Sequence, residues 1–426
     1  MLHTRYLWPV SFLLLSVLAS ESLVFGAEDL SGSLNAQLQQ GHLAAAQADL
    51  EMRLKAEPEE AQARFGLGVV QVLSAIEKLG QEQYRFGAMS GNIRNLPVLR
   101  LRVPVNLEPD EVRYEQVRQI IADFQRRLIE AEAELAKVDL KQKFKLKLDL
   151  NTIRLDLIGS GKKEDQTTFL QLFNAVNQRG PIAALPDLSV AFDNGDVLWL
   201  RGYCHFIAAF CDMILAYDHQ RLFDHVGQLI YPRHISSEPI TEPLDLVGGK
   251  DQTWQFMDLI TAIHLLNLPL KEPPRMESAR QHLLEMIRMS RESWALIQAE
   301  TDDDREWLPN PQQKGVLRIP VTREIIDGWH AVLIEMEELL EGRKLVPFWR
   351  DYASVFGGNR EIPEGTRGIN LKRVFAEPRD FDLILLIQGS GVRPYLERGP
   401  LSTPETWENL GRVFRGQFFG FAAWFN

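Results

Sequence analysis

Cysteine is scarce in this chain. Only Cys204 and Cys211 occur among the 426 residues, which argues against a fold held together by disulfides. Both lie in the apolar segment RGYCHFIAAFCDMILAY, which predicts a single helix. Seven residues of helix separate two Cα atoms by roughly 10 Å, whereas a disulfide requires about 7 Å or less. We therefore expect both thiols to be reduced and buried.

Positive charge is also in deficit. The net charge is −11, and no basic tract interleaved with aromatic residues offsets it, so we expect no nucleic-acid partner. Long apolar runs are missing after residue 27, because stretches such as 205–216 fall far short of the about 20 residues that span a bilayer. The sequence therefore predicts no transmembrane segment beyond the N-terminal region.

Familiar catalytic motifs are absent too. Neither GxSxG nor HExxH occurs, and zinc ligands are not clustered along the chain. The sequence Gly389-Ser390-Gly391 lacks the third glycine of a dinucleotide-binding loop and runs into Pro394. We predict no cofactor, and the missing motifs weaken an enzymatic function without excluding it.

The first 27 residues resemble a secretory signal sequence. Arg5 supplies the positive start, residues 10–19 form a short apolar run, and small residues follow. Cleavage is expected after Ala19 or near Ala27, and no cysteine follows the run to carry a lipid anchor. We expect export to a periplasmic or extracellular location. An uncleaved membrane anchor is the alternative.

Residues 28–90 are expected to form a helical hairpin. Its small and apolar positions, at spacings of a known repeat, are Gly41, Ala46, Leu50, Pro58 and Leu67-Gly68. Over about one and a half repeats, within 30–80, this spacing resembles the tetratricopeptide repeat. Arg53 and Gln71 depart from that pattern. The resemblance implies a helical solenoid and a protein or peptide partner, whereas an ordinary pair of antiparallel helices is the alternative.

Residues 91–165 contain a connector, a long helix and a short β element. The long helix is expected over 109–138 with Pro109 at its start, and from Tyr114 to Val138 its apolar residues recur at alternating steps of three and four. This seam fits either a homodimeric coiled coil or a helix packed inside its own domain. Alternation of period two over 144–158 predicts a strand, with a bulge or turn at Asn151-Thr152. Lysines on its other face fit an anion site or an exposed sheet edge.

Residues 166–426 are predicted to form a larger helical domain. The expected helices are 196–217, 252–267, 276–299 and 323–341, the last capped by Thr322 and ended by Gly342. The C-terminal part is irregular and rich in aromatic residues, and its last rings, such as Trp424 and Phe425, are expected to dock into the core. The fold class is therefore mainly α, with a solenoid-like N-terminal region packed on a helical domain and a minor β element.

Two polar residues on the helix expected over 196–217 are the candidate catalytic groups. His205 and Asp212 lie seven residues apart on one face, followed by His219. Burial without partners would cost several kcal/mol, so they form either a metal or acid–base pocket or a pair satisfied by neighbouring helices. Further acids and histidines lie close by at Asp218, Asp224 and His225. Before the helix, Asn194-Gly195 are expected to form a turn and Asp196 its cap.

A second candidate is a degenerate calcium loop over 156–167. Asp156 and Ser160 take the first and fifth ligand positions, but Ile158 and Thr167 stand where carboxylates belong. A plain turn is the alternative to a Ca²⁺ site in this loop, whereas a transition metal would belong to the pocket of His205 and Asp212. The acidic run 302–304 follows the C-terminal end of an expected helix, where the helix dipole disfavours negative charge. Arg305, a bound cation or solvent would have to offset that charge.

These observations predict an exported helical binding or scaffold protein with a protein or peptide partner. The alternative is an envelope enzyme or metal-dependent protein with its pocket around 193–225.

Overall fold

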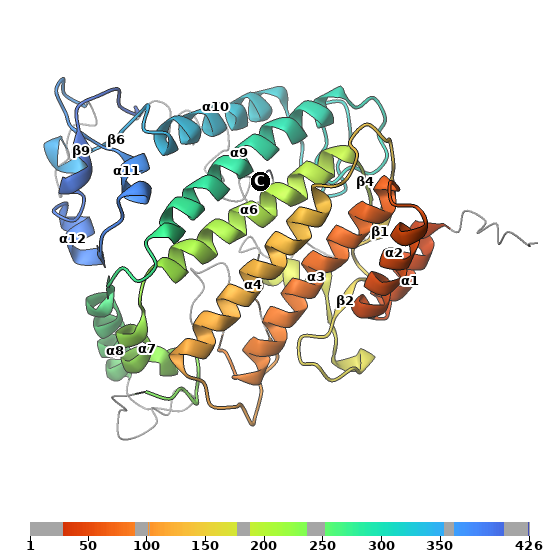
Figure 1. The fold of residues 1–426 in the computed structure, drawn as a ribbon, viewed down its shortest axis with the longest axis horizontal. Coiled ribbons are helices and arrows are strands. Elements are labelled where there is room, and N and C mark those ends of the chain that lie inside the picture. Colours follow the sequence, from red (N-terminus) through yellow and green to blue (C-terminus); the bar gives the residue numbers. More distant parts are fainter. Residues whose placement is uncertain are drawn as a thin grey trace, which may run out of the picture.

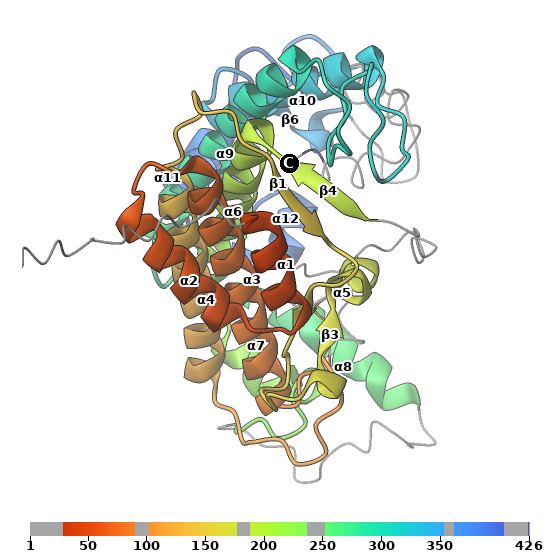
Figure 2. The same ribbon diagram turned by 90° about the vertical axis from the view of Figure 1, so that its right-hand side faces the viewer.

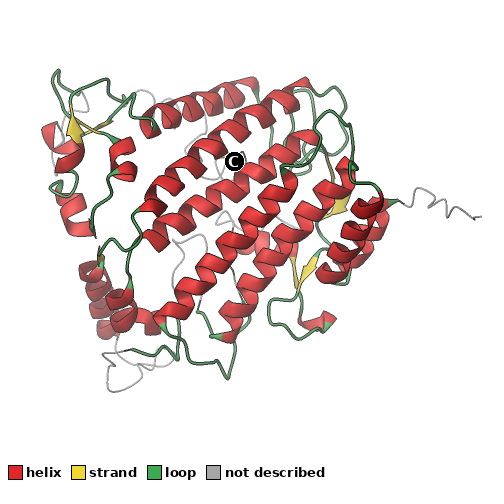
Figure 3. Ribbon diagram, in the orientation of Figure 1, coloured by secondary structure: helices red, strands yellow, loops and turns green. Residues whose placement is uncertain are grey.

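The computed structural model describes residues 29–89, 101, 103–176, 188–236, 252–352, 362–403 and 425. The expected signal sequence and Trp424 lie outside these residues, as do the aromatic positions 418–421. The described chain is mainly α-helical, as the sequence predicts, with short strand pairs as its β content (Figure 3).

Seven of the described helices lie side by side in the order of the chain and form one layer (Figure 1). They are α1 (Leu30–Gln39), α2 (Leu43–Ala56), α3 (Ala61–Arg85), α4 (Tyr114–Leu135), α6 (Asn194–Ala216), α9 (Pro274–Ala299) and α10 (Arg323–Leu340). One apolar core joins them and includes residues from Leu30 to Phe425. The segments expected as 28–90, 91–165 and 166–426 therefore share a single core.

The N-terminal hairpin forms where the sequence predicts it. Gly41 has a φ of +70° in the turn between α1 and α2, a conformation that glycine adopts without strain. Ala46 and Leu50 are buried on α2. Gly68 of α3 packs so closely on Leu135 of α4 that an added Cβ would overlap that side chain. Gly68 thus permits a close approach of α3 to α4.

The β element predicted over 144–158 is present as two strands. β1 (Leu146–Asp149) pairs antiparallel with β4 (Ser189–Phe192), and β2 (Arg154–Leu155) pairs with β3 (Thr167–Thr168). Between β1 and β2 the Thr152 amide donates to the carbonyl of Asp149 at 3.1 Å, which is the turn that the change of parity predicts. These strands and α5 (Phe169–Val176) lie on one side of the helical layer (Figure 2).

The long helix differs from its prediction in its start and in its packing. It begins at Tyr114 rather than Pro109, because the Gln116 side chain accepts from the Arg113 amide at 2.9 Å and so caps the helix there. The seam residues Phe124, Leu128 and Leu135 are buried in the chain's own core, between α3 and α6. The described seam residues of 109–138 are therefore packed inside the protein, which is the alternative to the homodimeric coiled coil given above.

Helix α6 occupies the middle of the layer. Its cap is Asp193, which accepts from the Gly195 amide at 2.8 Å, while Asp196 reaches back to the Asp193 amide at 3.0 Å. The prediction that Asp196 is the cap was wrong by one helical turn, because Asn194 and Gly195 are already helical. Among the described residues, α6 is also a helix long and apolar enough to cross a membrane, with half of its apolar window buried. It lies between α4 and α9, where a core helix belongs.

The remaining described elements gather at one end of the layer (Figure 1). They are α7 (Gln220–Val226), α8 (Gln252–Leu265), β5 (Asn267–Leu268), β6 (Val346–Pro347), β7 (Gly368–Ile369), α11 (Leu371–Ala376), β8 (Phe381–Asp382), α12 (Leu383–Gln388) and β9 (Leu396–Glu397). β6, β7 and β9 form one small sheet, and β5 pairs with β8. Thr322 caps α10, and Gly342, with a φ of +71°, follows its end, as predicted.

One C-terminal ring is described and is part of the core. Phe425 is 1% exposed and contacts Trp294 and Trp329, with ring centroids 4.8 Å and 5.9 Å away. The expected docking of Phe425 is therefore confirmed.

Replacing Gly68 by alanine is expected to destabilise the protein by about 1–3 kcal/mol, because the new methyl group must displace the buried Leu135 side chain. Gly66 provides a matched control on the same helix. A Cβ there would meet Leu34 at an ordinary 3.4 Å, so Gly66→Ala is expected to be neutral or stabilising by up to about 1 kcal/mol. Chemical denaturation of both variants measures the difference. Equal effects would contradict the close packing of α3 on α4.

Candidate functional site

His205 and Asp212 both point from α6 toward α9, where they meet partners that the sequence analysis missed. The Nδ1 atom of His205 lies 2.9 Å from Nδ1 of His282. Arg275 donates to Asp212 Oδ1 at 2.8 Å, and His282 Nε2 lies 3.8 Å from Asp212 Oδ2. The seven-residue spacing thus predicts the shared face correctly. We call the set Glu132, Arg201, His205, Asp212, Arg275 and His282 the histidine network.

The histidine network is anchored on α4 as well. Glu132 accepts from Arg201 Nε at 2.9 Å and lies 3.5 Å from His205 Nε2. Beyond the other end, Arg275 also pairs with Glu272 at 2.6 Å, and Glu272 pairs with Arg118 of α4 at 2.5 Å. A continuous row of charged side chains therefore joins α4, α6 and α9.

Burial and pairing change the titration of two members. Burial raises the pKa of Glu132, but hydrogen bonds from His205 and Arg201 outweigh it and hold that pKa below its usual value. The pKa of His282 is lowered by burial and then by the charge of neighbouring His205. Glu132 therefore stays ionised at neutral pH, and a positive charge on His282 is disfavoured.

The polar groups of the histidine network pair mainly with one another. Across the described residues, no group of three or more His, Cys, Asp or Glu side chains is placed to hold a metal ion. Asp212 is 2% exposed, and its buried atom Oδ2 has no hydrogen-bond partner among the described residues. The side chains of the histidine network are therefore partners of one another within a packed helix interface.

The other polar residues near the end of α6 do not join this network. Asp218 pairs with Lys271 at 3.2 Å, and the His219 amide donates to the Tyr114 hydroxyl at 2.6 Å. Asp224 accepts from the Gln220 amide group at 2.8 Å, within its own helix α7. The expected pocket around 193–225 is thus divided among separate contacts.

The degenerate calcium loop closes on its own aspartate. Asp156 accepts from the backbone amides of Gly159 at 2.9 Å, Ser160 at 3.2 Å and Gly161 at 2.7 Å. Both carboxylate oxygens are therefore engaged by backbone donors, and Ser160 Oγ accepts from the Lys162 amide. The geometry is that of a turn, the alternative considered for Asp156 and Ser160.

The acidic run 302–304 is compensated by a lysine that the sequence analysis placed elsewhere. Lys145, next to β1, pairs with Asp302 at 2.5 Å and also with Asp304. Arg305 instead donates to the Ser189 carbonyl at 2.6 Å. One lysine of the alternating strand thus holds the loop that follows α9, which neither the anion-site nor the edge interpretation predicted.

Four carboxyl groups come together where α6 begins and α9 ends. Burial raises the pKa of Asp193, of Asp196, of Glu300 to about 8 and of Glu306 to about 7, and repulsion from neighbouring carboxylates adds to each effect. Repulsion from Asp193 is the second cause of the raised pKa of Glu300, after burial. We call these residues the acidic cluster. Sequence patterns do not show it, because its halves are about a hundred positions apart.

An exposed apolar surface lies on α8 and α12, which contact each other. Its members are at least 40% exposed and are Phe256, Met257, Leu259, Ile260 and Ile263 on α8, with Ile384, Leu385 and Ile387 on α12. Soluble proteins rarely expose so many large apolar side chains together unless something binds there. We call this set the α8–α12 surface.

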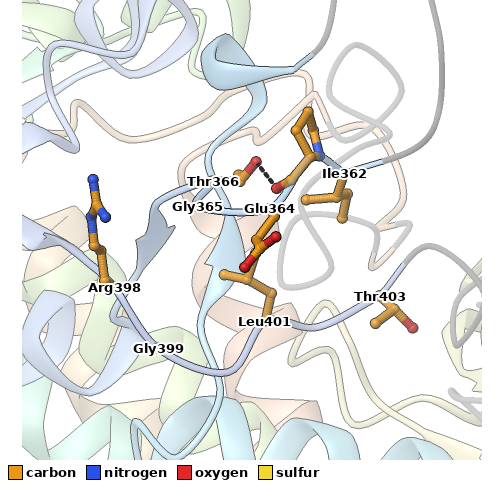
Figure 4. A pocket seen from close by; sticks show the side chains of 9 residues that line it. Ile362, Glu364, Gly365, Thr366, Arg398, Gly399, Leu401 and Thr403 are labelled. Atoms are coloured by element: carbon orange, nitrogen blue, oxygen red, sulfur yellow. Dashed lines mark hydrogen bonds between the residues drawn. The ribbon is translucent and has the colours of Figure 1, made fainter.

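Two cavities lie apart from the histidine network. One of about 380 Å³ is lined by Glu364, Thr366, Arg398 and Leu401, with Thr366 donating to the Pro363 carbonyl at 2.8 Å (Figure 4). Residues 353–361 and 404–424, its neighbours in sequence, are outside the described residues. The other, about 290 Å³, lies between α3 and α4 and carries charges of both signs. Neither cavity includes a candidate catalytic residue.

No family model, no curated protein and no solved structure matches this chain. The tetratricopeptide resemblance of residues 30–80 therefore stays a prediction, and function has to be argued from the surfaces and clusters described above.

The acidic cluster predicts a loss of stability as pH rises. A carboxyl whose pKa is raised on folding stabilises the folded state below its unfolded pKa, near 4.5, and loses that contribution as pH rises through about 8. Glu300→Gln is therefore expected to match the wild type near pH 5 and to be more stable near pH 9, by about 1–2 kcal/mol after allowance for partial exposure. Denaturation at both pH values measures this. Glu292→Gln, on the exposed side of α9, is the control, and parallel pH profiles would contradict the prediction.

The two cysteines are free and buried, as the sequence predicts. Burial raises the pKa of Cys204 to about 12 and that of Cys211 to about 12, so little thiolate forms at neutral pH. Native protein is expected to react negligibly with a thiol reagent, and both thiols are expected to react after unfolding without reductant. Rapid labelling of the native protein would contradict this expectation.

Proposed function

We propose that this chain is an exported binding protein whose α8–α12 surface binds an apolar segment of a partner protein. The observation that carries the proposal is the group of exposed apolar side chains on two contacting helices. Export rests on the resemblance of residues 1–27 to a secretory signal.

The spacing of these side chains suits recognition of a peptide. Phe256, Leu259, Ile260 and Ile263 stand at i, i+3, i+4 and i+7, the pattern with which one helix face meets another. α12 lies beside this stripe because β5 pairs with β8 and the Leu383 amide donates to the Leu266 carbonyl at 2.9 Å. A partner segment on this face would contact both helices.

Charge favours a protein over an anionic lipid surface as the occupant. Helices that lie on membranes usually carry lysine and arginine on their polar side. α8 and α12 contain neither residue, and the whole chain carries a net charge of −11. An apolar partner segment without strong negative charge fits these properties best.

The helical layer supports the same function. Packed helices in chain order provide a rigid support, and α7 packs against α8 and so holds one side of it. The tetratricopeptide resemblance implies a protein or peptide partner as well. In the alternative function, an enzyme centred on 193–225, His205 and Asp212 would have to leave their present partners, which weakens that alternative.

A photo-crosslinking amino acid at Leu259 tests the proposal in the native host. We expect one discrete protein adduct, which is lost when Ile263→Glu places a charge in the contact. The purified partner should then bind Ile263→Glu at least about tenfold more weakly, a loss of about 1.4 kcal/mol. Thermal melting should change little, because Ile263 is exposed.

The same probe at Met52 is the matched control, since Met52 is a large apolar residue, 62% exposed, on α2. No adduct is expected there. Adducts at both positions, or adducts with lipid alone at Leu259, would contradict the proposed function. An adduct with a second copy of the chain would show that this surface mediates self-association, and would contradict a separate partner protein.

A further inference from the structure

The two histidines of the histidine network face each other through the same ring atom. His205 Nδ1 and His282 Nδ1 are 2.9 Å apart, which is a hydrogen-bond distance. One of these nitrogens has to carry the hydrogen and the other has to accept it, because two hydrogens would collide and two lone pairs would repel. The space between the rings therefore holds one proton.

The outer ring nitrogens both face carboxylates. His205 Nε2 lies 3.5 Å from Glu132, and His282 Nε2 lies 3.8 Å from Asp212 Oδ2, the buried oxygen that lacks a partner. A lone pair aimed at a carboxylate is repulsive, so each Nε2 is best occupied by a hydrogen. In a neutral pair, each ring carries one hydrogen. Such a pair cannot fill both outer positions and the shared inner position together.

We propose that His205 and His282 form a site that binds one additional proton between them, and that a second additional proton breaks the pair and loosens α6 from α9. With one added proton, each ring donates to its carboxylate through Nε2 and the inner hydrogen bond is complete. With two, both Nδ1 atoms carry hydrogens across 2.9 Å and both rings are positive. All four ring nitrogens therefore have a favourable partner only when the histidine pair carries one added proton.

The charged groups around the two rings favour the histidine pair with one added proton. From α4, Glu132 and the amide of Gln125 face the network, and from α6, Asp212 and Arg201 do so. From α9, Arg275 pairs with Asp212 at 2.8 Å, and Glu285 adds a more distant negative charge near His282. The two arginines already share the two nearest carboxylates, so these balance one imidazolium but not two.

Acid should therefore act on the packing of α6 against α9. An unfolded chain takes up protons on both histidines near pH 6.5, whereas the folded pair resists the second one. The pKa of His282 is lowered in the folded protein, which agrees with this resistance to a second proton. A base whose pKa is lowered by folding stabilises the folded state above its unfolded pKa, and this contribution is lost as pH falls. The inference does not depend on the α8–α12 surface.

Nitrogen NMR of histidine-labelled protein tests the site directly. Near pH 7 we expect a through-bond ¹⁵N–¹⁵N coupling between the two Nδ1 atoms, which requires the shared hydrogen. This coupling should disappear in His282→Gln and in His205→Gln, and should weaken in the wild type as pH falls toward 5. Absence of the coupling in folded wild-type protein would overturn the proposal.

The pH dependence of unfolding is the second readout. Between pH 6.5 and 5.5 the unfolding equilibrium constant of the wild type should rise by about threefold more than that of His282→Gln, because unfolding takes up no net proton at pH 6.5 and nearly one at pH 5.5. His42→Gln, at the exposed start of α2, should follow the wild type. Equal pH slopes in all three proteins would overturn the proposal.

Metal analysis separates this site from the transition-metal alternative. We expect purified wild-type protein to keep the ¹⁵N–¹⁵N coupling after chelation, with no stoichiometric metal. A transition metal retained at one per chain and lost in His282→Gln would overturn the proton site.

Discussion

The packing of α6 against α9 is the contact on which the remaining structure depends. On one side of this pair lie α4, α3, α2 and α1, and on the other side lies α10, so every helix of the layer is placed through it. Apolar burial supplies the attraction but has no direction. Polar contacts at three positions along α6 and α9 fix how the two helices are aligned. They are Ser293 with the Gly195 carbonyl at 2.8 Å, the histidine pair, and Arg275 with Asp212.

Most helices were predictable because their signals are local. The apolar period, the Thr322 cap and the glycine after residue 341 place α10 within about a residue of its observed bounds. The long helix shows the limit of such signals. Pro109 is a favourable first residue, yet the hydrogen bond that the Gln116 side chain accepts from the Arg113 amide decides the start, and arginine is uncommon as an N-cap residue.

The residues of the candidate site that lie on one helix were predictable, whereas their partners on neighbouring helices were not. The spacing of His205 and Asp212 places them on one face, and burial requires partners for them. The identity of those partners, His282 and Arg275, depends on which helix packs beside α6. The acidic cluster and the pairing of Lys145 with Asp302 also depend on which elements pack side by side, so the sequence alone did not predict them. The apolar stripe of α8 looks in sequence like any core-facing stripe, because periodicity does not tell which face is covered.

The pairing of β5 with β8 brings together helices that are distant in the sequence. Leu268 lies opposite Phe381, so α8 and α12 leave the same strand pair although more than a hundred residues of chain connect them. A fragment that stops before Phe381 would keep α8 but lose the helix beside it. If a partner binds the α8–α12 surface as proposed, short linear peptides of this chain would each carry one part of that surface and bind weakly, and only the intact fold would present both parts together.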